Sequence, residues 1–198
     1  MSTTIDPVVL QQLVAQAVRQ LQKEGPQAAA PAVPAVHDEY GVFTTMADAI
    51  EASAAAQHTL LFQSPSQRQQ WIDVIRRTCL DKTNMQMMSR MAVEETAIGR
   101  YEDKVIKNTA AARYTPGIED LKTDARTGEH GLVLFEYCPF GVIGAITPTT
   151  NPTETIINNS ICMIAGGNTV VFSPHPRAKK TSIFLVQLFP YTTLFRST

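Results

Sequence analysis

Two short apolar runs on either side of a helix signal constrain the fold of this chain more than any other feature. The runs at 142–146 and 168–172 are rich in β-branched residues and too short for buried helices, so each predicts a buried strand. About twenty residues, 148–167, separate them, which suits a crossover helix better than a hairpin. The sequence therefore predicts an α/β fold with one right-handed βαβ unit of a parallel sheet.

The segment between the two strands carries the signals of a helix start. Asn151 is expected as the N-cap, Pro152 as the first helical residue, and Glu154 as the partner that closes a capping box. The helix is expected to run to about Ala165 and to end at the glycine pair that follows. A turn and an amide side chain therefore come directly after the first strand.

Ligands of open parallel sheets bind at the carboxyl ends of the strands. Here the first strand is followed by TPTTNPTET, and the second ends in FSPHPRAKK. These strings, with PFGVIGAITP before them, resemble the coenzyme A-acylating members of the aldehyde dehydrogenase superfamily. In the hydrolytic members a Trp-Asn-Phe-Pro turn and a Lys-Pro-Ser-Glu turn occupy these places. The resemblance implies a truncated Rossmann domain of that superfamily, with residues 40–188 as a partial NAD-binding domain.

The same resemblance implies an oxidoreductase that converts a small aldehyde into an acyl-CoA with NAD. In that reaction a cysteine thiolate adds to the aldehyde, hydride passes to the nicotinamide, and coenzyme A takes the acyl group from the thioester. The nucleophilic cysteine is expected in a later catalytic domain, for which this chain has no sequence. The chain alone is therefore expected to be inactive, and only the family favours NAD over NADP.

Asn151 is the catalytic residue that the resemblance implies for this chain. Its NH₂ group is expected to donate to the oxyanion that develops on the aldehyde, while its carbonyl oxygen caps the helix. The two roles use opposite ends of one amide, so they are compatible.

No GxGxxG motif follows the first strand, which argues against an ordinary Rossmann enzyme. The resemblance implies that the pyrophosphate is held by a later glycine turn, and that this chain contributes the two strand ends to the coenzyme site. The expected contacts are Ile146, Thr147, Pro148, Thr149, Ser173, His175 and Pro176. Ser173 and the His175-Pro176 pair replace the lysine and glutamate with which hydrolytic members grip the adenosine ribose. We expect a looser grip, which lets reduced coenzyme leave and coenzyme A enter by one channel. A turn role is favoured for His175, and a proton-shuttle role stays open.

Cys79, Cys138 and Cys162 have neither the spacing of metal ligands nor an even count. No metal site and no disulfide framework are expected. Cys79 and Cys162 lie at apolar positions of predicted helices, where an inert thiol is the usual state, and none of the three is assigned a catalytic role.

The charge balance limits the partners of the chain. A net charge of −1 and an isoelectric point near 6.4 give no electrostatic basis for binding nucleic acid or an anionic membrane. No apolar segment reaches the roughly 18 residues that span a bilayer, and the N-terminus lacks the layout of a secretory signal. A cytoplasmic location is expected.

Residues 1–25 predict a separate amphipathic helix, with apolar side chains at three- and four-residue steps and a polar, weakly charged opposite face. Residues 26–39, rich in alanine and proline, predict a semi-rigid linker. This arrangement resembles the encapsulation peptides of bacterial microcompartment enzymes, so residues 6–23 are expected to dock on a shell protein inside such a compartment. The alternative is a helix that packs on its own domain.

The segment from 41 to about 127 has a helical pattern throughout. Thr45 and Ser64 are expected to cap two helices, and a third is expected over 85–98. Past these, Glu102, Asp103, Lys104 and Lys107 have the spacing of ion pairs on a solvated helix face.

Residues 132–137 alternate enough to predict a strand outside the parallel sheet. By resemblance, this strand belongs to the arm through which the subunits of a homo-oligomer pair.

Residues 189–198 are expected to be an artefactual tail, because 189–197 can be back-translated to a widely used sequencing-adapter oligonucleotide. Two other hypotheses stay open. One is a short non-catalytic targeting or interaction protein that docks on a shell, and the other is the front end of a bifunctional aldehyde-alcohol dehydrogenase.

Overall fold

The computed structural model describes residues 41–189. The expected helix over 1–25, the linker over 26–39 and the expected tail beyond Phe189 lie outside the described residues. The elements follow the order α2 (Met46–Leu60), α3 (Pro65–Leu80), α4 (Lys82–Thr96), α5 (Tyr101–Tyr114), the 3-10 turn η1 (Ile118–Asp120), β1 (Asp124–Gly128), β2 (Gly131–Phe135), β3 (Val142–Thr147), α6 (Pro152–Ala165), β4 (Thr169–Pro174), η2 (Pro176–Ala178) and α7 (Lys179–Leu188).

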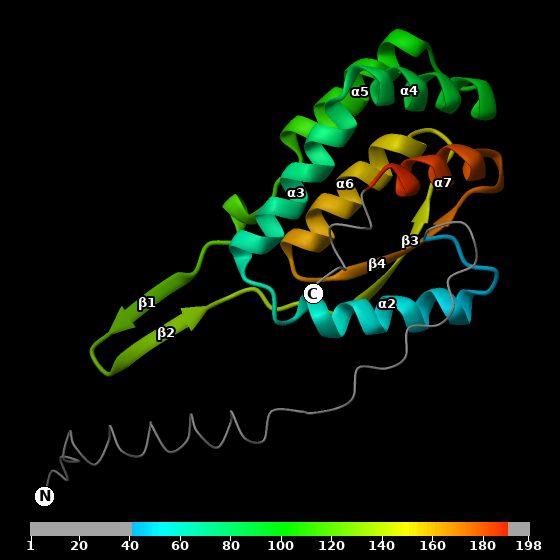
Figure 1. The fold of residues 1–198 in the computed structure, drawn as a ribbon. Helices are drawn as coiled ribbons and strands as arrows, with labels where there is room; N and C mark the ends of the chain where they lie inside the picture. Colours follow the sequence, from blue (N-terminus) through cyan, green and yellow to red (C-terminus); the bar gives the residue numbers. More distant parts are fainter. Residues whose placement is uncertain (1–40, 190–198) are drawn as a thin grey trace, which may run out of the picture. The chain divides into compact units, whose positions relative to one another are not determined.

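The predicted βαβ unit is present and confirms the α/β fold. β3 and β4 pair in parallel, with Val142 opposite Thr169 and Thr147 opposite Pro174. α6 connects the two strands, and in Figure 1 β4 runs between α6 and α2. The second strand begins one residue later than predicted because Asn168 has another role. Its Oδ1 accepts the backbone N–H groups of residues 140 and 141 at 2.6 and 2.9 Å, which ties the start of β3 to the end of α6.

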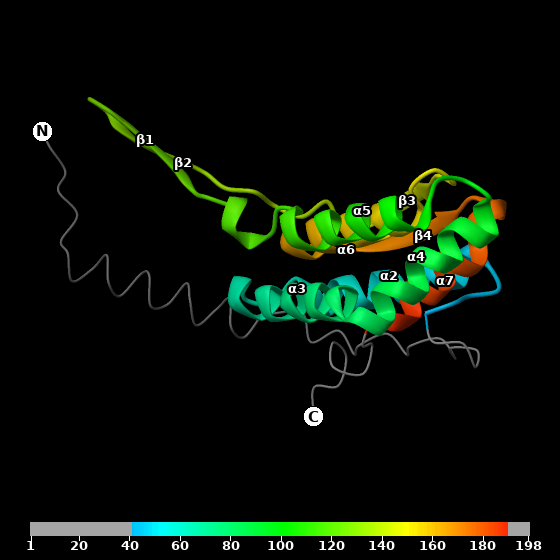
Figure 2. The same cartoon turned by 90° about the horizontal axis from the view of Figure 1, so that it is seen from above.

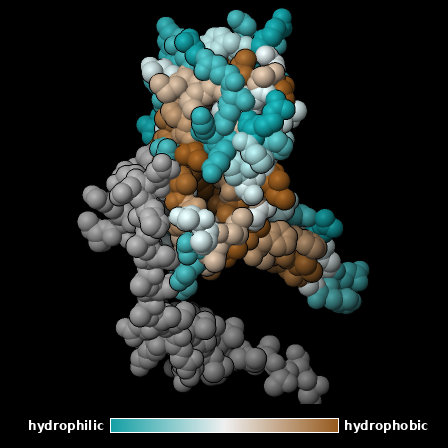
Figure 3. All heavy atoms as spheres, turned by 90° about the vertical axis from the view of Figure 1, so that its right-hand side faces the viewer, coloured by the Kyte–Doolittle hydropathy of each residue, from teal (hydrophilic) through white to brown (hydrophobic). Residues whose placement is uncertain are grey.

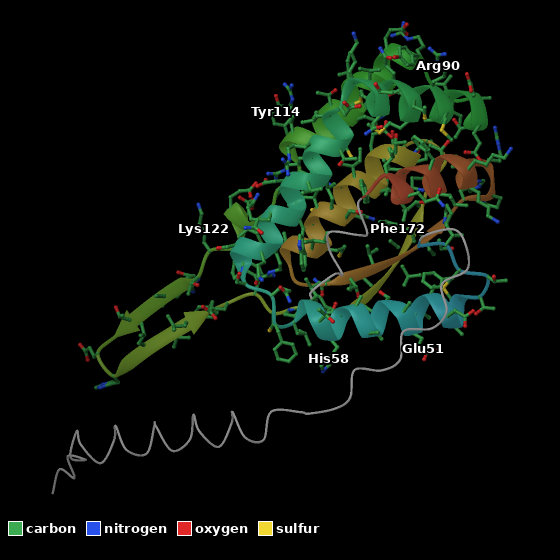
Figure 4. All side chains as sticks on the ribbon, in the orientation of Figure 1. Glu51, His58, Arg90, Tyr114, Lys122 and Phe172 are labelled. Carbon is green, nitrogen blue, oxygen red and sulfur yellow. The ribbon has the colours of Figure 1, made fainter. Side chains whose placement is uncertain are left out.

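The hydrophobic core lies between α6 and the helices α3, α4, α5 and α7. The side chains in it that are at most 1% exposed include Ile72, Ile75, Met88, Ile156, Ile157, Ile161 and Leu185. Each buried aliphatic side chain of this size stabilises the fold by about 1.5–3 kcal/mol. Figure 2 shows the same helices from above, and Figure 4 labels Phe172, the β4 side chain that packs against this core.

The two predicted helix caps are confirmed. The Thr45 hydroxyl accepts the backbone N–H of residue 48 at 3.2 Å, and Ser64 and Gln67 form a capping box. The third helix begins at Lys82, three residues earlier than predicted. The Asp81 carboxylate is the reason, because it accepts the N–H groups of residues 83 and 84 at 2.9 and 3.0 Å.

The prediction of helix as far as 127 is wrong at its end, where Asp124–Gly128 forms β1. β1 pairs antiparallel with β2, so the prediction of a strand outside the parallel sheet is confirmed. The side chains of Leu132, Val133, Leu134 and Phe135 are all at least half exposed, and the guanidinium of Arg126 lies 4.9 Å from the Phe135 ring centre. Figure 3 shows that apolar surface remains open on the described part of the molecule.

No helix within residues 41–189 has both the length and the apolar composition that crossing a membrane requires.

Candidate functional site

The carboxyl ends of β3 and β4 lie side by side. Thr147 and Pro174 are the last register pair, and the backbone N–H of His175 continues the ladder by donating to the Thr147 carbonyl oxygen at 3.1 Å. The turn that leads to α6 and the turn that leads to α7 therefore start from the same edge of the sheet. This geometry brings the two groups of predicted coenzyme contacts, 146–149 and 173–176, to one place.

The two faces of β3 differ in exposure. Ile146 is 88% exposed, and a Cβ built on Gly144 would meet no atom within 4 Å, so this face is open. Thr147 points to the opposite face and is 1% exposed, with no hydrogen-bond partner for its hydroxyl within residues 41–189. Ile146 can therefore offer its side chain to a ligand, whereas Thr147 is buried and its carbonyl oxygen already accepts the N–H of His175.

Asn151 occupies the N-cap position of α6, but its side chain makes no cap hydrogen bond. Its Oδ1 accepts instead from the ammonium of Lys107 at 3.2 Å. The prediction that the amide oxygen caps the helix is wrong, because a charged donor competes better for the oxygen than a backbone N–H does. No acceptor for the Asn151 NH₂ group occurs among the described residues, so this end of the amide is available to a ligand.

The predicted capping box of α6 is also absent. Glu154 Oε1 lies 3.4 Å from Nζ of Lys104, and Oε2 accepts from the Thr153 hydroxyl at 3.0 Å. The carboxylate therefore faces a buried cation and not the N-cap backbone.

Lys104 overturns the prediction of a solvated charged face on α5, because its side chain is 2% exposed. Its ammonium donates to the Thr150 carbonyl oxygen at 2.6 Å and pairs with Glu154. Sequence reasoning missed this residue. The four-residue spacing of Lys104, Asn108 and Ala112 places them on one face of α5, and the structure shows that this face is buried.

The turn after β4 is held by α4. The Glu95 carboxylate accepts the backbone N–H groups of Lys180 and Thr181 at 2.8 and 2.7 Å, and Arg177 donates to the carbonyl oxygen of Thr96 at 2.8 Å. Burial alone would raise the pKa of Glu95, but the hydrogen bonds from Thr181 and Lys180 and the charge of Lys180 outweigh burial and lower it. These contacts fix the start of α7 against α4.

His175 has a structural role in this turn. Its Nδ1 accepts the backbone N–H of Arg177 at 3.1 Å, which caps η2. Ser173 is half-buried, and His175 and Pro176 are exposed.

The charges around the strand ends suit an anionic ligand. Neither 142–149 nor 168–176 contains an acidic residue, and the exposed cations Arg177, Lys179 and Lys180 follow directly. The first N–H groups of α6 receive no side-chain cap, so the positive end of the helix dipole is open at Asn151. Nucleotides and coenzyme A carry phosphate groups. The carboxylates that flank these segments already have partners, since Glu95 accepts the N–H groups of Lys180 and Thr181 and Glu154 pairs with Lys104.

Burial disfavours the thiolate form of two of the three cysteines. Cys79 is buried, which raises the pKa of its thiol to about 12, and burial also raises the pKa of the half-buried Cys162. Cys138 is exposed on the segment after β2. Within residues 41–189, no group of His, Cys, Asp and Glu side chains has the geometry to hold a metal ion.

When Pro152 is matched to the proline of the Trp-Asn-Phe-Pro turn, the family resemblance implies that Thr150 takes the place of the asparagine and Asn151 the place of the phenylalanine. Thr150 is exposed. Two neighbouring side chains, a hydroxyl and an amide, are therefore candidates for the same donor role.

The comparison with known proteins agrees with this geometry. The aldehyde dehydrogenase family matches residues 39–194. A propanal dehydrogenase (CoA-propanoylating) of Salmonella typhimurium is 49% identical over 149 residues, which is 75% of this chain and 32% of that protein. The chain thus spans about a third of the length of this curated relative.

Solved structures give the same result. Propionaldehyde dehydrogenase of Rhodopseudomonas palustris, with bound propionyl-CoA, matches with a TM-score of 0.76 and 58% identity over 78% of this chain and 34% of the other. A propionaldehyde dehydrogenase from the fucose utilisation bacterial microcompartment of Clostridium phytofermentans matches with a TM-score of 0.75 and 49% identity, over 79% of this chain and 36% of the other. The family match covers most of the sequence and the βαβ unit with its two strand ends, so this chain belongs to the aldehyde dehydrogenase family.

Proposed function

We propose that this chain is the N-terminal part of an NAD-dependent, coenzyme A-acylating aldehyde dehydrogenase and forms one wall of its coenzyme and acyl-transfer cleft. The observation that carries the proposal is the joined edge of β3 and β4, where the turn bearing Asn151 and the turn bearing His175 meet. Relatives whose names describe CoA-acylating dehydrogenases support the reaction class.

The reaction has a defined balance. A small aldehyde, NAD⁺ and coenzyme A give the acyl-CoA, NADH and a proton, with a cysteine of the proposed parent enzyme carrying the acyl group between the two steps. The bound nicotinamide accepts the hydride. The described residues would contribute an open apolar floor at Ile146, a positive approach at Arg177 and Lys180, and a hydrogen-bond donor for the oxyanion.

Asn151 is the proposed oxyanion donor, because its NH₂ group is the end of the amide that no described residue uses. Thr150 is the second candidate, since its hydroxyl stands where hydrolytic members have the amide. In the full-length enzyme, Asn151→Ala should slow the first turnover of NADH formation about 100-fold. Thr150→Val should then leave this rate within about twofold. The opposite order of effects would transfer the donor role to Thr150.

The turn after β4 is proposed to hold the nucleotide loosely. Ser173 is half-buried, and neither it nor Pro176 supplies the charge that a lysine or a glutamate gives. Ser173→Lys should therefore slow NADH release and the entry of coenzyme A. If neither step slows, the loose-grip hypothesis fails.

The overall proposal is tested on the enzyme encoded by the uninterrupted gene. Purified enzyme is mixed with propanal, NAD⁺ and coenzyme A, and the products are quantified by absorbance and mass spectrometry. NADH and propanoyl-CoA are expected in equal amounts, and without coenzyme A at most one NADH per active site is expected. Propanoate formed without coenzyme A would contradict the proposal. An authentic stop codon directly after Thr198 would favour the non-catalytic targeting protein, and a fused alcohol dehydrogenase domain would favour the bifunctional enzyme.

Residues 6–23 are proposed to dock on a microcompartment shell protein, which would place the enzyme inside such a compartment. The support is the amphipathic pattern on an Ala/Pro tether and a relative that comes from a microcompartment. Deletion of residues 1–25 should abolish association with shell protein and leave the thermal transition of the body unchanged. Unfolding of the body would show instead that the helix packs on its own domain.

The parent enzyme is proposed to be a homo-oligomer that pairs through the exposed β1–β2 hairpin, in which β2 carries the apolar side chains. Leu134→Asp should reduce the oligomer mass measured by light scattering, and an unchanged mass would exclude this surface.

A further inference from the structure

We propose that Lys104 and Lys107 of α5 are positioning residues for the oxyanion donor Asn151. The two lysines hold two consecutive residues of the turn after β3, one through its backbone and the other through its side chain. The inference rests on the proposed function of Asn151 and assigns a role to a helix that contains none of the predicted site residues.

Lys104 fixes the peptide that precedes Asn151. Its ammonium lies 2.6 Å from the Thr150 carbonyl oxygen and 3.4 Å from Glu154 Oε1, and the lysine side chain is 2% exposed. A buried ammonium needs both partners, because removing a charge from water is costly unless the charge is paired and hydrogen-bonded. The plane of the peptide between residues 150 and 151 is thereby tied to α5 and to the first turn of α6.

Lys107 fixes the orientation of the amide itself. An ammonium group has three donors and no acceptor, so the Asn151 atom that faces it at 3.2 Å must be the oxygen. The NH₂ group then points away from Lys107. A flip of the amide would set two donors against each other, so Lys107 selects the orientation that presents N–H groups to a ligand.

The same contact strengthens the donor. A cation that hydrogen-bonds to an amide oxygen draws electron density from the nitrogen, and hydrogen bonds in a chain polarise one another. The N–H groups of Asn151 therefore become better donors to a developing negative charge. This benefit is largest in the transition state, where that charge appears.

α5 is a suitable support because it packs against two helices that adjoin the site. One is α6, which begins at the turn after β3, and the other is α4, which holds the turn after β4 (Figures 1 and 2). Asn108, one helical turn beyond Lys104, is fully buried and donates to the Ser89 hydroxyl of α4 at 3.0 Å. The helix that carries both lysines is therefore anchored independently of the turn that it positions.

The test is a double-mutant cycle in the full-length enzyme, with the rate of the first turnover of NADH formation as the readout. Lys107→Met should lower this rate about fivefold and leave the KM values for aldehyde and NAD⁺ unchanged. Lys107→Arg, which keeps a donor-only cation, should restore the rate to within about twofold. In the Asn151→Ala background, Lys107→Met should have no further effect, because the group that it positions is gone.

Lys122→Met is the matched control, since it removes the same charge from an exposed lysine that Figure 4 labels beside the hairpin. Equal losses from Lys107→Met and Lys122→Met would show a general charge effect and overturn the inference. Independent, multiplying effects of Lys107→Met and Asn151→Ala would overturn it as well.

Lys104→Met should slow the first turnover more than Lys107→Met, provided that circular dichroism shows a folded protein. If this variant does not fold, the cycle with the exposed Lys107 decides alone. An Asn151→Ala enzyme with the wild-type rate would refute the donor assignment itself. A slow Asn151→Ala enzyme with an unaffected Lys107→Met enzyme would refute only the positioning role.

Discussion

The buried lysine of α5 gives a prediction for stability that needs no activity. Lys104→Met removes the ammonium and leaves two groups without their partner, the Thr150 carbonyl oxygen and the Glu154 carboxylate. A hydrogen bond to a charged group contributes about 1.5–3 kcal/mol, and breaking a buried ion pair on one side costs about 3–5 kcal/mol. Because Glu154 is 11% exposed and can regain some water, the lower part of this range applies, and a loss of about 3 kcal/mol is expected.

The assay is urea unfolding of the 198-residue chain, followed by circular dichroism. Lys107→Met is the matched control on the same helix, and as an exposed change it should stay within about 0.5 kcal/mol of wild type. Adding Glu154→Leu to Lys104→Met should recover part of the loss, because it removes the unpaired carboxylate. Equal effects of the two lysine variants, or a larger loss in the double variant, would refute the account of Lys104 as a buried, paired cation.

Three other features give predictions that can be measured on the same chain. Burial raises the pKa of the Cys79 thiol to about 12, so Cys79 should resist iodoacetamide at pH 8 until the protein unfolds. The exposed Cys138 should react at once. Mass spectrometry of the labelled peptides measures the extent of reaction at each cysteine. Gly167→Ala should lower the free energy of unfolding by about 1–2 kcal/mol, because the φ of Gly167 is +74° and the new Cβ would lie 3.0 Å from the guanidinium nitrogen of Arg68. Gly144→Ala, on the open face of β3, should change the free energy of unfolding by less than about 1 kcal/mol. Because the pKa of Glu95 is lowered in the folded state, its contribution to stability is present above the unfolded-state pKa and is lost as the pH falls through the folded-state pKa. Glu95→Gln should therefore lose less stability than wild type as the pH falls below about 5. An equally steep loss in both proteins would contradict this.

The elements that sequence reasoning predicted well depend on short-range signals. The β-branched runs of β3 and β4, the proline that begins α6, and the serine and threonine caps of α3 and α2 all act within a few residues. The prediction that the carboxyl ends of β3 and β4 lie at one edge of the sheet followed from the rule for βαβ crossovers, which needs only the order of the elements along the chain.

The contacts that sequence reasoning missed join residues far apart in the chain. Lys104 and Thr150 are 46 residues apart, and Lys107 and Asn151 are 44 apart, so no local pattern shows that α5 reaches the turn after β3. The charge spacing on α5 fits a solvated face equally well, and only tertiary packing excludes that interpretation for Lys104. The prediction of a capping box at the start of α6 was wrong for the same reason, because the ammonium of Lys104, distant in the sequence, competes for the Glu154 carboxylate.

The central claim is that the ends of β3 and β4 form the coenzyme-facing wall, and hydrogen exchange tests it most directly. In the full-length enzyme, peptides that cover 144–151 and 173–178 should gain protection when NADH binds, while peptides that cover residues 70–80 of α3 should not change. Protection on α3 or on the exposed side of α5, with unchanged exchange at both strand ends, would contradict the account.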